Sequence, residues 1–245
     1  MQSNNRFLNV ILNAIIIALS ISRDVRAVPT GSFEANPKKI DKPTHTGGVT
    51  LVEGLKDWNL IPKSMIGIQL GRSANGADGT GQITLGGSDT SKYKTGPGNL
   101  ETLSNQDTSG LGLWAMNIAD VNVDGKTVSS NRQTILDTGN TQILVSNGDA
   151  QLFHNYPGTF KTPDGIFGVP CDHTKIPPMS FKIGSVEFQI NPVDIIGMKI
   201  GNRGLCYSLI QDTPRARWSL GTPFMKSVYQ IFDSDANKIT LAKLK

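Results

Sequence analysis

Apolar and polar residues alternate along several short stretches of this chain, and a period of two is the pattern of strands with one buried face. Turn residues separate the stretches, and Asp124-Gly125 and Gly184-Ser185 fit two-residue hairpin turns. A Gly-rich loop over residues 72–81 joins the first two stretches, and it lacks the Lys and the following helix of a phosphate-binding loop. We therefore predict strands over residues 65–70, 82–87, 113–123, 179–183, 186–190, 228–233 and 238–242.

Helical patterns are short. Residues 51–58 (L-V-E-G-L-K-D-W) and 149–156 (D-A-Q-L-F-H-N-Y) predict two brief helices, the second of them capped by Asp149. The 26 glycines and 13 prolines also favour many short strands joined by turns. The sequence thus predicts an all-β fold with short accessory helices, and it contains no repeat of 20–50 residues.

The first residues carry a different pattern. Residues 7–22 are mostly apolar but short and interrupted by Asn, and V-R-A follows at residues 25–27. This arrangement predicts a secretory signal peptide over residues 1–27, with an uncleaved membrane anchor as the alternative. Residues 28–50 are polar and aperiodic, which predicts a flexible, pro-segment-like stretch before a domain over residues 51–245. We expect a secreted, extracellular protein with no stable membrane span once the signal is removed.

The bulk charge excludes some partners. Lys and Arg number 24 against 20 for Asp and Glu, and the basic residues are scattered instead of forming a patch. A nucleic-acid partner is therefore not expected, because such proteins gather basic side chains on one face.

The predicted secretion determines whether we interpret the two cysteines as a disulfide or as free thiols. Cys171 and Cys206 are an even number of cysteines in an oxidising compartment, which predicts one disulfide. The isolated histidines (His45, His154 and His173) add no ligand cluster, so no metal site is expected.

The strongest chemical signal is Q-T-I-L-D-T-G-N-T-Q-I-L-V at residues 133–145. Apolar runs flank a tight polar loop, so strands would hold the Asp137 carboxylate at a fixed point. Two interpretations are open from these residues alone: a carboxylate placed for chemistry, or a turn aspartate that accepts hydrogen bonds from main-chain amides.

The segment I-L-D-T-G-N-T resembles the active-site loop of the pepsin-like aspartic endopeptidases. About 80 residues later, R-W-S-L-G-T-P-F at residues 217–224 resembles the closing segment of that family's C-terminal lobe. There, the element corresponding to Leu220-Gly221 packs beneath the catalytic loop. The segments at residues 60–70 and 83–93 resemble the connection between the two lobes. The resemblance implies that residues 51–245 form a C-terminal lobe with an inter-lobe segment, and the cysteine pair falls where that lobe has a disulfide.

The resemblance also assigns roles within the loop. It implies that Asp137 is catalytic and that Thr138, Gly139 and Thr141 support it. Asn140 replaces the family's hydroxyl residue, which hydrogen-bonds the catalytic carboxylate. Its amide can donate to the same oxygen, but Asn is longer and adds an acceptor, so we expect an altered orientation or proton affinity of the Asp137 carboxylate.

The chain departs from the family in one respect that matters for chemistry. Family enzymes use two D-T-G loops, and this sequence contains one. The segment Asp107-Thr108-Ser109-Gly110 does not replace the second, because its glycine is displaced by one position. A second carboxylate would have to come from another copy of the chain or from a separate N-terminal lobe. Without it, we expect no catalysis.

The function implied by the resemblance is a secreted aspartic-type endopeptidase. Its substrates would be proteins or peptides, cut at acidic pH between large apolar residues, outside the cell or in an acidic vacuolar compartment. No cofactor is expected. The alternatives are a catalytically inactive, secreted peptide-binding half-lobe and a truncated gene product.

Overall fold

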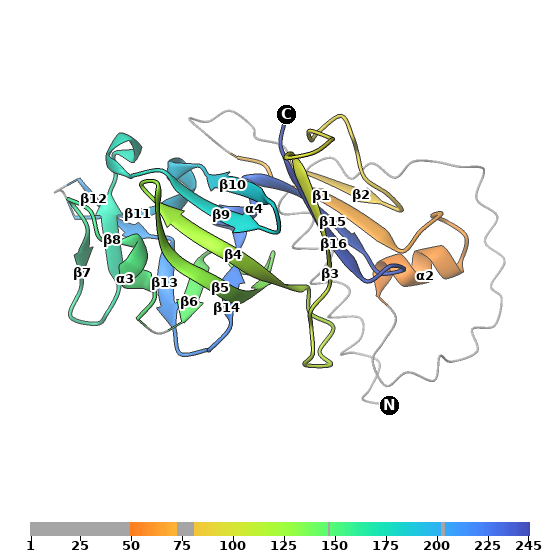
Figure 1. Ribbon diagram of the computed structural model, residues 1–245, viewed down its shortest axis with the longest axis horizontal. Coiled ribbons are helices and arrows are strands. Elements are labelled where there is room, and N and C mark those ends of the chain that lie inside the picture. Colours follow the sequence, from red (N-terminus) through yellow and green to blue (C-terminus); the bar gives the residue numbers. More distant parts are fainter. Residues whose placement is uncertain (1–49, 73–80, 147, 202–203) are drawn as a thin grey trace. The chain divides into compact units, whose positions relative to one another are not determined.

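The computed structural model of the chain describes residues 50–72, 81–146, 148–201 and 204–245. The segments predicted as a signal peptide (1–27) and as a pro-segment (28–50, save its last residue) lie outside these ranges. The chain forms two compact units (Figure 1). Of the described residues, those up to Asp89 and Ile231–Asn237 form unit 1, and those within Thr90–Gln230 and Lys238–Lys245 form unit 2. None of the described helices is both long and apolar enough to cross a bilayer.

Unit 1 holds the first predicted helix and hairpin. Its described elements are α2 (Leu51–Asp57), β1 (Met65–Gln69) and β2 (Gln82–Leu85). Helix α2 begins at Leu51 because Thr50 and Glu53 form a capping box, in which each side chain accepts a hydrogen bond from the other residue's main-chain amide. The antiparallel pairing of β1 with β2 confirms the predicted hairpin. Asp235 ties the segment Ile231–Asn237 to this unit through Lys56 and through the Ser64 amide at 3.0 Å.

Unit 2 is built on a seven-stranded sheet and a four-stranded sheet. In spatial order, the larger sheet holds β10 (Val186–Ile190), β9 (Met179–Ile183), β4 (Ala115–Val123), β5 (Lys126–Leu136), β14 (Trp218–Leu220), β6 (Ile143–Ser146) and β13 (Ile210–Thr213). The smaller sheet holds β11 (Ile196–Ile200), β12 (Leu205–Ser208), β8 (Phe167–Pro170) and β7 (Phe160–Lys161). Strand β3 (Leu100–Ser104) pairs with β16 (Lys238–Lys243), and β15 (Val228–Asp233) carries the chain from unit 2 into unit 1. The predicted β-rich class with short helices is confirmed.

Both short hairpin turns lie where the sequence predicts them. Asp124 and Gly125 join β4 to β5 with φ values of 52° and 72°. Gly184, with φ 57°, begins the turn between β9 and β10. Left-handed backbone at these positions matches the right-handed twist of the flanking strands, so two residues suffice to reverse the chain.

Aromatic rings fill the core of unit 2. The ring of Phe153 in α3 (Ala150–Phe153) lies 5.7 Å from that of Trp218 and 6.1 Å from that of Phe181. Phe181 in turn meets Phe224 of α4 (Thr222–Met225) at 5.5 Å. All four side chains are almost fully buried. The two short helices, α3 and α4, therefore pack against the sheet mainly through these large aromatic rings. Two single-turn helices complete the unit: η1 (His173–Lys175) and η2 (Pro192–Ile195).

The predicted cap of the second helix is wrong. Asp149 precedes α3, but its side chain makes no capping hydrogen bond. Its carboxylate instead accepts from the Arg132 guanidinium and the Trp218 indole, both at 3.1 Å. The carboxylate of Asp212 in β13 takes over the capping, because its Oδ1 accepts from the amides of Gly148 at 2.9 Å and Ala150 at 3.0 Å.

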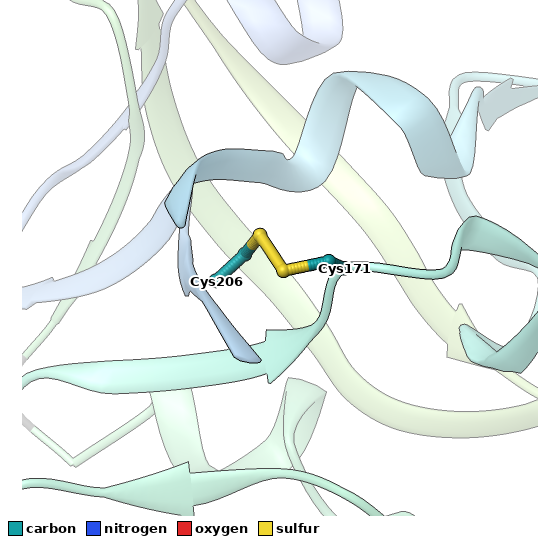
Figure 2. Close-up of a disulfide and its surroundings, with 2 residues drawn as sticks. All are labelled: Cys171 and Cys206. Atoms are coloured by element: carbon teal, nitrogen blue, oxygen red, sulfur yellow. A yellow bond between two sulfur atoms is a disulfide. The ribbon is translucent and has the colours of Figure 1, made fainter. Parts of the chain in front are cut away.

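The predicted disulfide joins Cys171 to Cys206 (Figure 2). The bridge links the end of β8 to β12, which are neighbours in the four-stranded sheet. Cys206 is only 4% exposed, and the Cys171 amide donates to the Gly204 carbonyl at 2.9 Å. The bridge therefore closes a loop across an already paired part of the sheet.

Candidate active site

The D-T-G loop, residues 137–142, connects two strands that are not neighbours. Strand β5 ends at Leu136 and β6 begins at Ile143, and β14 lies between them (Figure 1). Strand β14 runs parallel to β5 and antiparallel to β6, with Leu220 level with both Leu136 and Ile143. The loop must therefore cross the end of β14, which brings Leu220 and Gly221 to it.

Main-chain hydrogen bonds fasten the loop to this crossing. The Asp137 amide donates to the Leu220 carbonyl at 3.2 Å, and the Thr222 amide donates to the Asn140 carbonyl at 2.8 Å. A Cβ atom at Gly221 would collide with the main-chain oxygens of Asn140 and Gln142. Only glycine permits so close an approach of two backbones.

The Asp137 side chain is half-buried, and its Oδ1 accepts a hydrogen bond from the Gly139 amide at 3.0 Å. This bond is the turn interaction that a structural aspartate would make. Within the described chain, no other donor reaches the carboxylate. Asp137 thus uses one oxygen to shape its own loop and keeps hydrogen-bonding capacity for a further partner.

Asn140 does not make the hydrogen bond to Asp137 that its side-chain amide could make. Its amide donates to the hydroxyl of Ser219 at 3.2 Å and not to Asp137. Its Oδ1 accepts from the Gln142 amide at 3.0 Å, and this bond turns the NH₂ group toward β14.

Thr138 is half-buried and Thr141 is exposed. Neither side chain makes a hydrogen bond within the described residues, so their supporting roles stay predictions. Ser219 is the loop contact that sequence reasoning missed. It lies directly before Leu220-Gly221, but it is 79 residues from Asn140, and no local pattern connects the two.

The segment that begins at Asp107 is a self-contained turn. The Asp107 carboxylate accepts from the amide and hydroxyl of Ser109 and from the Leu113 amide. These hydrogen bonds lower the pKa of Asp107 to about 2, and the bond from the Ser109 hydroxyl contributes most. The positive charge of Arg217 adds to this shift. Both oxygens of Asp107 are engaged in these local contacts, and that the segment is no second catalytic loop stays a prediction.

A polar hollow of about 630 Å³ lies elsewhere, on strands β4, β5, β9 and β10. Its side chains are paired with one another: Glu187 accepts from Asn122 and Ser180, and Lys182 lies 3.7 Å from Asp120. Asp137 does not line it. Among the described residues, no group of three or more His, Cys, Asp or Glu side chains could hold a metal ion.

Comparison with known proteins places this geometry in a family. The sequence profile described as "Eukaryotic aspartyl protease" matches residues 39–244. A probable aspartic-type endopeptidase CTSD of Arthroderma benhamiae is 35% identical over 200 residues, which cover 80% of this chain and 38% of the relative. Rhizopuspepsin-1 of Rhizopus niveus is 30% identical over 81% of this chain and 49% of its own length. Cathepsin E of Aquarana catesbeiana is 30% identical over 75% of this chain and 46% of its own length.

The chain thus spans about half the length, or less, of these curated relatives. The profile nevertheless extends over most of the chain, and the region that it matches contains both the D-T-G loop and the strand that this loop crosses. The chain belongs to the eukaryotic aspartyl protease family.

Proposed function

We propose that this chain supplies one half of the active site of an aspartic-type endopeptidase, with Asp137 as its catalytic carboxylate. One observation carries the proposal: the D-T-G loop crosses the end of β14, where Gly221 allows main-chain contact with Asn140. A surface turn would not need two strands and a second backbone to hold it. The carboxylate is therefore presented from a rigid base.

The chemistry requires a second carboxylate. In aspartic proteases, the established example of this arrangement, two carboxylates about 3 Å apart share one proton, because both cannot ionise so close together. One of them activates water as a general base, and the proton on the other polarises the scissile carbonyl. Asp137 keeps hydrogen-bonding capacity for such a partner, since Gly139 is the one hydrogen-bond donor that the described chain brings to its carboxylate.

The second carboxylate has two sources. We propose either Asp137 of a second copy, with the two loops related by a two-fold axis, or an aspartate of an N-terminal lobe. The proposed substrates are proteins cut at acidic pH between large apolar residues, and no cofactor takes part. Residues 51–245 would form the C-terminal lobe with its inter-lobe segment.

Secretion is part of the proposal. Residues 1–27 would direct the chain out of the cell or to an acidic vacuole, and residues 28–50 would form the pro-segment-like stretch. The disulfide between Cys171 and Cys206 supports an oxidising route, because such bonds are rare in the reducing cytosol. N-terminal sequencing of the secreted chain tests this part, and a secreted chain that still begins at Met1 would overturn the cleavage.

The activity is tested by peptide cleavage at pH 3–5 over a hundredfold range of protein concentration. If two copies form the site, the rate rises with more than the first power of concentration and is abolished in Asp137→Asn. Asp164→Asn is the matched control, because Asp164 is exposed and lies in another turn before a glycine. Its rate should equal that of the unchanged chain.

A separate lobe gives a different result. The chain alone is then inactive at every concentration, and cleavage appears when an N-terminal lobe of a relative is added. Folded, disulfide-bonded protein that cleaves in neither experiment would sink the endopeptidase proposal.

A further inference from the structure

Asn140 is the most heavily engaged residue of the D-T-G loop. Its main-chain amide donates to the Asp137 carbonyl at 3.2 Å, and its main-chain carbonyl accepts from the Thr222 amide at 2.8 Å. Its side chain accepts from the Gln142 amide at 3.0 Å and donates to the Ser219 hydroxyl at 3.2 Å. Three of these bonds connect Asn140 to its own loop or to Thr222, where the two backbones cross. The fourth reaches into β14.

The Ser219 end of that fourth bond is rigid. Ser219 is 9% exposed and lies in β14, which is paired with β5 on one side and with β6 on the other. Its main chain is level with Ile135 of β5 and Leu144 of β6, the strands that begin and end the loop. The bond to Asn140 therefore connects the loop to a fixed point in the middle of the sheet.

The Asp137 carboxylate, by contrast, is held through the loop alone. Its single hydrogen bond within the described chain comes from the Gly139 amide, and Gly139 is exposed. The direction of the carboxylate thus follows the backbone of residues 138–140. Whatever fixes that backbone also fixes the carboxylate.

We propose that Asn140 and Ser219 form a positioning pair, in which the bond between their side chains holds the loop so that the Gly139 amide stays directed at Oδ1 of Asp137. The consequence for catalysis rests on the proposed function, whereas the consequence for the loop does not. A carboxylate that loses its alignment by about 1 Å can cost a reaction on the order of a hundredfold in rate.

Ser219→Ala tests the proposal in the full chain, because it removes the hydroxyl and leaves Asn140 unchanged. The readout is the solvent-exchange rate of the Gly139 amide, measured by NMR. We expect exchange to accelerate about fivefold, the factor implied by the loss of one hydrogen bond. Ser219→Thr keeps the hydroxyl and should restore the slow rate.

Ser180→Ala is the matched control. Ser180 is 6% exposed, lies in β9 of the same sheet, and donates one side-chain hydrogen bond to Glu187. It should leave Gly139 exchange unchanged. If Ser219→Ala does not fold, Asn140→Ala is measured in its place. It removes the same bond from the loop side together with the one from the Gln142 amide, so unchanged exchange in this variant is the decisive result.

The result separates the two proposals. Unchanged Gly139 exchange in a folded Ser219→Ala or Asn140→Ala variant, or equal acceleration in Ser180→Ala, overturns the positioning pair. Where cleavage is observed, Ser219→Ala should lower kcat by about tenfold or more with little change in KM, because substrate binding is not touched. If no cleavage is ever found, the exchange measurement still decides whether Asn140 and Ser219 position Asp137.

Discussion

The Nε2 atom of His154 lies 2.8 Å from the hydroxyl oxygen of Ser208, and both side chains are buried. The Ala150 carbonyl, 2.6 Å from Nδ1, can only accept, so Nδ1 carries the proton. Nε2 then accepts from the Ser208 hydroxyl, whose oxygen accepts from the Ile210 amide at 3.0 Å. The network is complete with a neutral imidazole, and a proton on Nε2 would reverse the bond to Ser208 and leave the hydroxyl proton without this acceptor.

Acid should therefore destabilise the protein through His154. Burial lowers the pKa of His154 from 6.5 to about 4, and the hydrogen bond to the Ala150 carbonyl and the nearby Asp212 charge offset this only in part. Between these two values the unfolded chain binds a proton that the folded chain does not, so stability decreases as the pH falls. The loss should reach about 3 kcal/mol near pH 4.

Urea unfolding at pH 7 and pH 4 measures this loss. His154→Gln, which keeps a donor and an acceptor but does not titrate, should lose about 3 kcal/mol less than the unchanged chain over this interval. His173→Gln, at an exposed position, is the control and should behave like the unchanged chain. Equal losses in all three proteins would contradict the assignment.

Gly221→Ala should destabilise the protein strongly. The added Cβ would collide with the main-chain oxygens of Asn140 and Gln142, and the Asn140 oxygen cannot move away without breaking its hydrogen bond from the Thr222 amide. Overpacking of this kind costs about 1–3 kcal/mol or more. Chemical denaturation checks the loss, with Gly87→Ala as control, because a Cβ at Gly87 meets no atom within 4 Å. A similar small effect at both glycines would contradict the close approach.

Asp212→Ala should cost about 1–3 kcal/mol, since its carboxylate accepts hydrogen bonds from two amides at the start of α3. The change in free energy of unfolding is compared with that of Asp164→Ala. Asp164 is exposed, and its substitution should change stability by less than about 0.5 kcal/mol. If the two variants match, the capping role of Asp212 is wrong.

The case of Asp212 shows why local patterns stop short of the structure. The sequence places an aspartate, Asp149, directly before the helix, and local rules assign the cap to it. The actual cap is 62 residues from Ala150 and reaches it only because β13 lies beside β6. The Asp149 carboxylate instead accepts hydrogen bonds from Arg132 and Trp218. The predicted start of the helix is confirmed, but the order of the strands in the sheet decides which carboxylate caps it.

The hairpins give the opposite result. Asp124-Gly125 and Gly184-Ser185 supply the backbone conformations that two-residue turns need, and the alternating strands beside them fix the register. All the information is local, so the sequence predicts both. In the candidate site the D-T-G loop and Leu220-Gly221 were found by resemblance. The bond from Asn140 to Ser219 was not, because a side chain's choice between partners follows from three-dimensional distances.

Removal of the disulfide should destabilise the protein by about 4 kcal/mol on the chain-entropy estimate for a loop of 35 residues. The variant is Cys171→Ser with Cys206→Ser, and its unfolding is compared with that of the oxidised parent. The reduced parent serves as the control, and it should match the double variant. A loss below about 1 kcal/mol would show that the loop is already confined in the unfolded chain.

The position of this bridge also has a consequence for proteolysis. The loop between Cys171 and Cys206 contains η1, β9, β10, η2 and β11, including Met198, which is 77% exposed. A single cut anywhere in that loop would leave the two fragments covalently joined. A nicked chain would therefore run as one band on a non-reducing gel, with a mass increased by one water. It would separate into two bands once a reductant is added. Because exchange needs a thiolate and the described residues hold no free cysteine, acidic conditions would preserve that link.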